Sequence, residues 1–494
     1  MSDVYIPGIQ SRLGSDKLIE DLMRLERIPK DRAESNISRY ENEKGYWQSI
    51  STKLSALRES ARQLFSFNNP FNEFVARSSD ESALVATASR NADEQIRSFT
   101  VKQVAESDRF LSSPLSEDFR VEGGTYSFTI GSEEISFDFR GGTLTDFTDA
   151  LNRRSRDKLQ ASLVAVKPGT KSLFIESKVT GEDNRLSFNG AALNLGVSTG
   201  MLEVAEGGQR ALNPISTAQD AIISMEGIQI QRSSNEINDL VTGVTLKVMD
   251  VSDKPVRINI QPDRESIKDS IISFVGNYNR VLAEINLLTV NDMKVIEELS
   301  YLNEEEMDKY RKQLAPLAGD STLMQMRSSL TRIMGSPYET SQGLDMVLLV
   351  QIGIGTDVRR SSGGSTSTSQ LRGYLEIDEK ALDAAIATNI NGIRQLFAYD
   401  TDGDLIADTG IAYSVDLLTR PYVETGGLLS MKTNSMDSRI NQEQQRIATL
   451  DRQLAAKEAD LKKQYAQMES AYARMEQMTT SFDRFNQQNS NSNR

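Results

Sequence analysis

Both ends of the chain carry an apolar stripe with the spacing of a helix. Near the C-terminus the stripe repeats every seven residues, the seam pattern of a coiled coil, at Ile440, Ile447, Leu454, Leu461, Met468, Met475 and Phe482. Polar residues, among them Glu443, Lys457 and Gln464, interrupt the second row of this seam. Such a helix cannot bury its stripe alone. The pattern therefore predicts a partner, either the N-terminal helix or another copy of the chain.

The N-terminal stripe predicts a helix over about residues 16–65. Pro29 interrupts the pattern and is expected to mark a break or a new first turn. The single Trp lies on the stripe, where a place in a helix core or interface is far more common than a ligand platform. The stripe residues that we expect at a helix interface are Leu18, Leu22, Leu25, Trp47 and Leu54.

The middle of the chain changes to the two-residue alternation that is typical of strands. Residues 126–139 predict a hairpin, a short helix capped by Thr143 follows, and residues 164–175 predict a second hairpin. Together they form a ββαββ module. Residues 186–217 show no clean period, so we expect loops and weak strands there. A second strand-rich region covers residues 220–260.

Helical patterns return after Asp263, a candidate N-cap, and continue to about residue 335. Residues 361–370 predict a flexible polar loop, and residues 373–382 predict a strand followed by a helix that Asp378 caps. The polar residues 486–494 are expected to be a disordered tail.

These patterns predict an α+β multidomain fold, with terminal coiled-coil helices and a helical-bundle leg that carry an inserted β-rich head. The expected divisions are an N-terminal helical segment at 1–40, a helical leg at 41–75 plus 263–428, an inner β head at 76–118 plus 216–262, an outer head with the ββαββ motif at 119–215, and a C-terminal coiled-coil helix with its tail at 429–494.

Composition removes several kinds of chemistry. The chain has no Cys and no His, which excludes cysteine nucleophiles, histidine bases and Cys/His zinc sites. A net charge of −14 without a basic stripe argues against nucleic-acid binding. The polar N-terminus lacks the apolar region of a cleavable signal peptide, and no window is apolar enough for a membrane span.

The candidate sites for chemistry are weak. Asp400, Asp402 and Asp404 in DTDGD resemble a calcium loop only faintly, because Gly is fourth and Ile411 stands where an EF-hand has Glu. The spaced glycines of residues 353–364 lack the Lys of a phosphate-binding loop. Paired acids such as Asp378–Glu379 are typical of solvated helix faces. We therefore expect no catalytic residue, no cofactor and no metal.

Several sequence blocks are specific when taken together. They are PGIQSRLGSDKLIEDLMRLERIPKDR (7–32), the run from Gly123 to Asn184 with GGTLTDFTDALN, AQDAIISMEGIQIQRSSNEINDLVTGVTLKV (218–248), FVGNYNRV (274–281), IGIGTD (352–357), GYLEIDEKAL (373–382) and IRQLF (393–397). In these blocks the chain resembles, over almost its whole length, the flagellar filament-capping family, also called hook-associated protein 2 or FliD.

The resemblance implies a non-enzymatic protein that caps the distal tip of a bacterial flagellar filament. It implies a homo-oligomeric ring, commonly of five copies, that retains exported flagellin and promotes its folding and polymerisation. The other partners it implies are hook–filament junction proteins and an export chaperone at the C-terminal region. It also implies secretion through the flagellar export apparatus, to an external or a periplasmic flagellum. Three alternatives are open: a flagellar tip adhesin, another hook-junction axial protein, and a carboxylate-based glycosidase.

Overall fold

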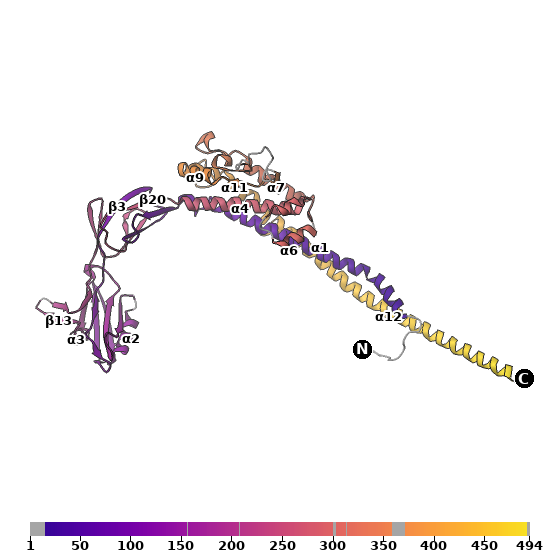
Figure 1. Ribbon diagram of the computed structural model, residues 1–494, viewed down its shortest axis with the longest axis horizontal. Helices are drawn as coiled ribbons and strands as arrows, with labels where there is room; N and C mark the ends of the chain where they lie inside the picture. The colour runs from indigo at the N-terminus through magenta and orange to yellow at the C-terminus, as the bar shows by residue number, and fades with distance from the viewer. Residues whose placement is uncertain are drawn as a thin grey trace. The chain divides into compact units, whose positions relative to one another are not determined.

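The computed structural model describes residues 15–155, 157–206, 208–299, 303–312, 314–357 and 371–491. The chain divides into two compact units, one formed by residues 1–68 with 268–494 and the other by residues 69–267 (Figure 1). Both ends of the chain thus belong to one unit, and the second unit is a single insertion. The loop expected at residues 361–370 lies outside the described residues, and so does most of the glycine run at residues 353–364.

The unit that contains both ends of the chain is mainly helical. Its helices are α1 (Ser15–Gln63), α4 (Arg264–Thr289, which begins at the unit boundary), α5 (Lys294–Glu297), α6 (Glu304–Lys312), α7 (Ser321–Gly335), α9 (Glu379–Thr388), α10 (Ile390–Phe397), α11 (Ile411–Val423) and α12 (Leu428–Asn491). A two-stranded ribbon joins β21 (Ile354–Gly355) to β22 (Glu376–Ile377). Asp263 and Asp378 accept the backbone N–H bonds expected of caps on α4 and α9.

Two sequence expectations for the long helices are wrong. Pro29 lies inside an uninterrupted α1, although a proline removes one helical hydrogen bond. Packing along α12 supports the helix on both sides of Pro29. The supposed disordered tail is also helical as far as Asn491, because α12 continues through it.

The inserted unit begins with two sheets that pack around one core. The first has the strand order β1-β20-β3-β16-β17 and the second β18-β19-β2, and both are antiparallel. The strands are β1 (Phe74–Ser78), β2 (Leu84–Ala88), β3 (Gln95–Gln103), β16 (Ala221–Met225), β17 (Ile228–Arg232), β18 (Glu236–Val241), β19 (Val244–Val248) and β20 (Val256–Pro262). Alternate residues such as Phe99, Ile223 and Ile258 fill the space between them.

The rest of the inserted unit contains the predicted ββαββ module. Its hairpins are β7–β8 (Gly124–Ile130, Glu133–Phe139) and β10–β11 (Leu159–Val164, Thr170–Ser177), with α2 (Leu144–Arg154) between them. Thr143 and Asp146 form a capping box at the start of α2. The hairpins lie in different sheets, because β7 pairs with β12 and β11 pairs with β4. The remaining strands of this region are β4 (Arg109–Leu111), β5 (Leu115–Ser116), β6 (Arg120–Val121) and β9 (Gly142–Thr143).

Residues 186–217 are more ordered than their composition indicates. They form β12 (Leu186–Gly190), α3 (Ala191–Ser198), β13 (Leu202–Ala205), β14 (Gly208–Ala211) and β15 (Pro214–Ser216). The sequence pattern did not predict α3, because this helix is short and rich in small residues. Ala192 and Leu195 of α3 are buried against the aromatic core of the module, so tertiary packing stabilises this helix.

Candidate assembly interface along the terminal helix pair

The first and last helices of the chain lie side by side and antiparallel (Figure 1). Polar contacts fix their register: Ser15 Oγ donates to Glu469 at 2.6 Å, Lys30 Nζ to Asp451 at 2.6 Å, and Asn36 Nδ2 to Glu443 at 3.0 Å. The residue numbers of the partners on α12 fall as those on α1 rise, as expected for an antiparallel pair. The N-terminal helix is therefore a partner that the C-terminal stripe has within the chain.

The helix pair buries an apolar seam, and only some of the predicted stripe residues belong to it. From α12, Ile440 is buried and the predicted Ile447, Leu454 and Leu461 are half-buried. From α1, Ile19 and Met23 occupy the buried face. Further along α1, the predicted Trp47 and Leu54 are completely buried within the chain, and Lys432 Nζ lies 4.5 Å from the centre of the Trp47 ring. A contact of either residue with another subunit stays a prediction.

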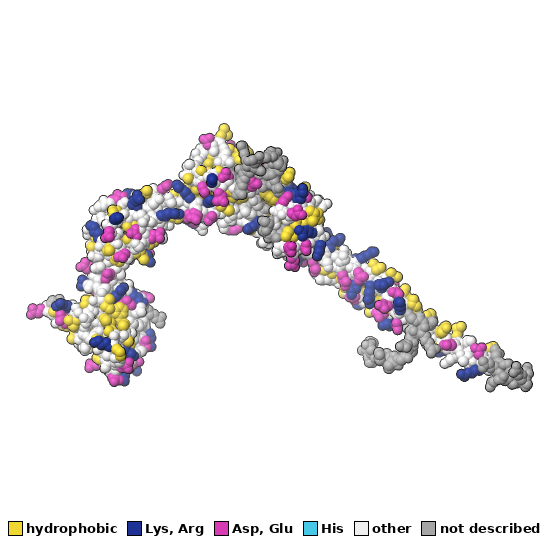
Figure 2. Space-filling view, viewed as in Figure 1, with side chains coloured by type: hydrophobic (Ala, Val, Ile, Leu, Met, Phe, Trp, Pro, Cys, Tyr) yellow, Lys and Arg dark blue, Asp and Glu magenta, His cyan; other side chains and the backbone are white. Residues whose placement is uncertain are grey.

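The apolar pattern of α12 continues beyond the point where it meets Ser15. At and beyond this point the predicted seam residues are exposed, with Met468 at 48%, Met475 at 67% and Phe482 at 69%. On α1 the predicted trio Leu18, Leu22 and Leu25 points away from the seam and is 40–62% exposed. Hydrophobic side chains are accordingly visible on the surface of this helix pair (Figure 2). The pair thus displays two apolar stripes, which we name the α1 stripe (Leu18, Leu22, Leu25) and the tail stripe (Met468, Met475, Phe482).

Polar residues in the second row of the seam have partners on α1. Glu443 accepts the bond from Asn36, and its buried Oε2, which has no hydrogen-bond partner, forms an ion pair with Arg446 of the same helix at 3.6 Å. Lys457 lies 3.9 Å from Glu26. These pairs specify the register of the two helices more than they add stability, because an exposed ion pair contributes little to the free energy of unfolding.

Two buried acids anchor α1 to the rest of the helical unit. Glu284 of α4 is almost fully buried and pairs with Lys53 Nζ at 3.0 Å. Asp416 of α11 pairs with Arg58 at 2.7 Å and with Arg420 at 2.8 Å. Burial acts to raise the pKa of Asp416, but the hydrogen bonds from the two guanidinium groups outweigh it and hold this pKa below its usual range. The helix that carries the α1 stripe is therefore held firmly at its other end.

The FV-x-x-YN block has a structural role that sequence reasoning did not assign. Tyr278 donates to the carbonyl of Gly373 at 3.0 Å, and the Asn279 amide both donates to and accepts from the backbone of Leu375 at 2.8 Å. Burial raises the pKa of Tyr278 to about 12, so the hydroxyl stays a donor at every physiological pH. This block of α4 thus fixes the backbone of residues 373–375.

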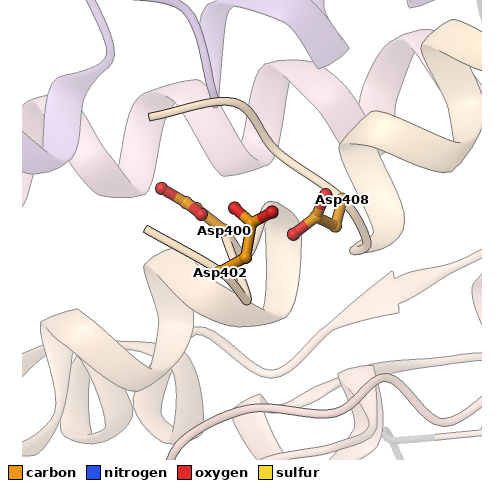
Figure 3. Close-up of side chains that lie close together, drawn as sticks. All are labelled: Asp400, Asp402 and Asp408. Atoms are coloured by element: carbon orange, nitrogen blue, oxygen red, sulfur yellow. The ribbon is translucent and has the colours of Figure 1, made fainter. Parts of the chain in front are cut away.

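Asp400 and Asp402 of the DTDGD turn lie with Asp408 in a cluster whose carboxylate oxygens are within 4.8 Å of one another, between α10 and α11 (Figure 3). The third candidate from the sequence, Asp404, is not part of this cluster. Asp400 accepts the N–H groups of Gly403 and Leu405, and Asp408 accepts the N–H of Thr401. Burial acts to raise the pKa of Asp400, and the backbone donors lower it overall. These bonds fix the turn itself, so the cluster alone is no evidence of a metal site.

The architecture defines a class of protein: a chain whose two ends form an antiparallel helix pair and whose middle forms inserted β domains. Profiles of one family match most of the chain. The N-terminal profile of flagellar hook-associated protein 2 covers residues 11–108, and its C-terminal profile covers residues 218–477. The chain therefore belongs to the flagellar hook-associated protein 2 (FliD) family.

Individual relatives agree with this assignment. The flagellar hook-associated protein 2 of Treponema maltophilum is 29% identical, over 90% of this chain and 93% of its own length. The protein of the same name from Treponema pallidum is 27% identical over the same shares. The crystal structure of the flagellar cap protein FliD D1-D2-D3 domains from Escherichia coli covers 81% of this chain and 99% of its own, with a TM-score of 0.52 at 21% identity.

The family assignment confirms the resemblance and the α+β fold with terminal helices and a β-rich region. It also argues against the alternative of another hook-junction protein, because both matching profiles are those of hook-associated protein 2. A structural, non-enzymatic protein is consistent with this family. Among the described residues, none of the helices is both long and apolar enough to cross a membrane. The five expected divisions of the chain stay predictions.

Proposed function

We propose that this protein caps the distal tip of a bacterial flagellar filament, where copies of the chain form a ring that retains exported flagellin and promotes its folding and polymerisation. The observation that carries the proposal is the pair of apolar stripes left exposed by the terminal helices of a protein in this family. In water such stripes favour association, because covering them removes apolar surface from solvent.

The two stripes have separate parts in this proposal. The α1 stripe lies beside a seam that the chain already fills, so it fits a neighbouring subunit. The tail stripe lies on the part of α12 at and beyond its contact with Ser15, so it fits neighbouring subunits while the ring assembles and, in the assembled cap, the filament end, where it would contact flagellin and release it as each subunit inserts. Polar interruptions such as Glu443 support repeated rearrangement, since they make the seam weaker than a fully apolar one.

The proposed route to this site is export through the flagellar apparatus. Before export, a chaperone would cover the tail stripe. After export, junction proteins would precede the cap on the growing structure, and the flagellum could be external or periplasmic. The number of copies in the ring, five by family resemblance, is part of the proposal.

A truncated chain that ends at Glu469 tests the function. It removes Met475 and Phe482 but keeps the part of α12 that packs on α1, so both units should fold, and the circular dichroism spectrum should lose only the helical signal of the removed residues. In cells that lack the native protein, the truncated chain should be exported without supporting filament growth. Filaments of normal length from this variant would contradict the proposal.

A further inference from the structure

Three exposed methionines gather near the end of the last helix. Met468 and Met475 belong to the tail stripe, and Met478 lies in the second row of the same heptad on α12. Met475 at 67% and Met478 at 72% are the two most exposed methionines among the described residues, and Met468 is half exposed. We name Met468, Met475 and Met478 the tail methionines.

An oxidant in solution can reach the sulfur atoms of the tail methionines. The chain has no Cys, whose thiolate would otherwise react with the oxidant first. Its single Trp, Trp47, is completely buried. The other exposed methionines of the described residues are scattered along the chain, at Met249, Met293, Met324 and Met431. The surface that is most readily oxidised is therefore concentrated on the tail of α12.

Oxidation of these side chains changes the property on which the tail stripe depends. A thioether is flexible and apolar, whereas a methionine sulfoxide is polar and accepts hydrogen bonds through its S=O group. Covering an oxidised stripe would remove water from these groups, and burying a polar group without a new hydrogen bond is unfavourable. The same surface that favours association in its reduced form thus opposes association once it is oxidised.

We propose that the tail methionines are an oxidation site through which hydrogen peroxide controls self-assembly of the protein. The sulfur lone pair attacks one peroxide oxygen, so that an S–O bond forms while the O–O bond breaks. The second oxygen leaves as water after a proton transfer, so the sulfur is oxidised by two electrons and the peroxide is reduced by two. Methionine sulfoxide reductases, with a dithiol as the electron donor, return the sulfoxide to the thioether.

The inference rests on the self-association in the proposed function and adds a regulation of the tail stripe. The reduced chain assembles, and the oxidised chain stays unassembled until its sulfoxides are reduced. Because the tail methionines lie at or beyond the contact of α12 with Ser15, their oxidation leaves the packed part of the helix pair unchanged. The fold is therefore kept while assembly is lost.

The test uses the full chain. The protein is treated with hydrogen peroxide, freed of it, and followed by sedimentation velocity, while mass spectrometry of proteolytic peptides locates the sulfoxides. We expect sulfoxides at the tail methionines, an unchanged circular dichroism spectrum, and an assembly midpoint that moves to at least about tenfold higher protein concentration. Treatment with reductases for both sulfoxide epimers and dithiothreitol should restore the midpoint, and this dithiol has no disulfide to break in a chain without Cys.

Two matched leucine variants locate the effect. The tail variant, Met468→Leu, Met475→Leu, Met478→Leu, keeps the surface apolar and the helix propensity high but has no sulfur to oxidise. It should assemble like the wild type and keep its midpoint after peroxide. The control replaces three exposed methionines elsewhere, Met249→Leu, Met324→Leu, Met431→Leu, and should be as sensitive to peroxide as the wild type.

Each contrary outcome has a definite meaning. A wild-type protein that assembles at an unchanged midpoint although its tail methionines are oxidised overturns the inference and leaves the proposed function standing. A tail variant as sensitive to peroxide as the control places the effect on other residues and overturns it as well, and so does peroxide treatment that leaves the tail methionines as thioethers. An untreated wild-type protein that stays monomeric at all concentrations overturns the ring and the inference together.

Discussion

Replacing the tail stripe with serine should weaken self-assembly without unfolding the protein. The variant is Met468→Ser, Met475→Ser, Phe482→Ser. The three side chains are 48%, 67% and 69% exposed in the single chain. Their exposed surface together equals that of almost two fully exposed side chains. Burying a Met or Phe side chain contributes about 1.5–3 kcal/mol, so complete covering of the stripe would contribute about 3–5 kcal/mol per subunit. That is a change of at least about a hundredfold in an association constant.

The assay is sedimentation velocity over a range of protein concentrations. The midpoint of assembly should move upward by about two orders of magnitude in the serine variant. Thermal unfolding should be almost unchanged, because these residues lie at or beyond the end of the contact with α1 at Ser15.

The matched control uses the opposite side of the same helix. Ala466→Ser, Ala473→Ser and Thr480→Ser have the same spacing of seven, and all three residues are exposed. This control has a similar effect on helix propensity and should assemble like the wild type. If the stripe variant and the control assemble at the same concentration as the wild type, the tail stripe takes no part in self-association.

Two further predictions concern the anchoring of α1. Lys53→Met leaves the buried Glu284 without its cation and should lower the free energy of unfolding, measured in urea, by up to about 3 kcal/mol. This value is at the low end for a buried ion pair because Lys53 is partly exposed. The double variant Lys53→Met with Glu284→Leu should recover most of the lost stability, and an equal loss in the single and double variants would show that the ion pair is not responsible. The pKa of Asp416 is lower in the folded protein than in the unfolded chain, so its contribution to stability is present at neutral pH and is lost as the pH falls through the folded pKa. Asp416→Asn should therefore be less stable than the wild type at pH 7 and should lose less stability between pH 5 and acid; parallel pH profiles would contradict this.

Local patterns in the sequence determined most elements of the fold. The capping residues Thr143, Asp263 and Asp378 act through bonds to N–H groups two or three positions away, and each was predicted correctly. Strand alternation at residues 126–139 and the helix at the heptad repeat of α12 were also predicted correctly, since the period of side chains follows from backbone geometry. These features depend only on neighbours in the chain.

Tertiary structure alone decided which apolar face meets which partner. On α1 the leucines of the α1 stripe match the pattern of a seam, yet Ile19 and Met23 are the residues buried against α12. Pro29 stays inside a helix, and α3 forms, because packing supplies the free energy that local preference lacks. The antiparallel register also sets where α12 passes Ser15, and hence which of its heptads are exposed. The sequence by itself determines that the chain has more apolar stripe than one helix can bury, whereas the pairing of distant segments determines which part is left for a partner.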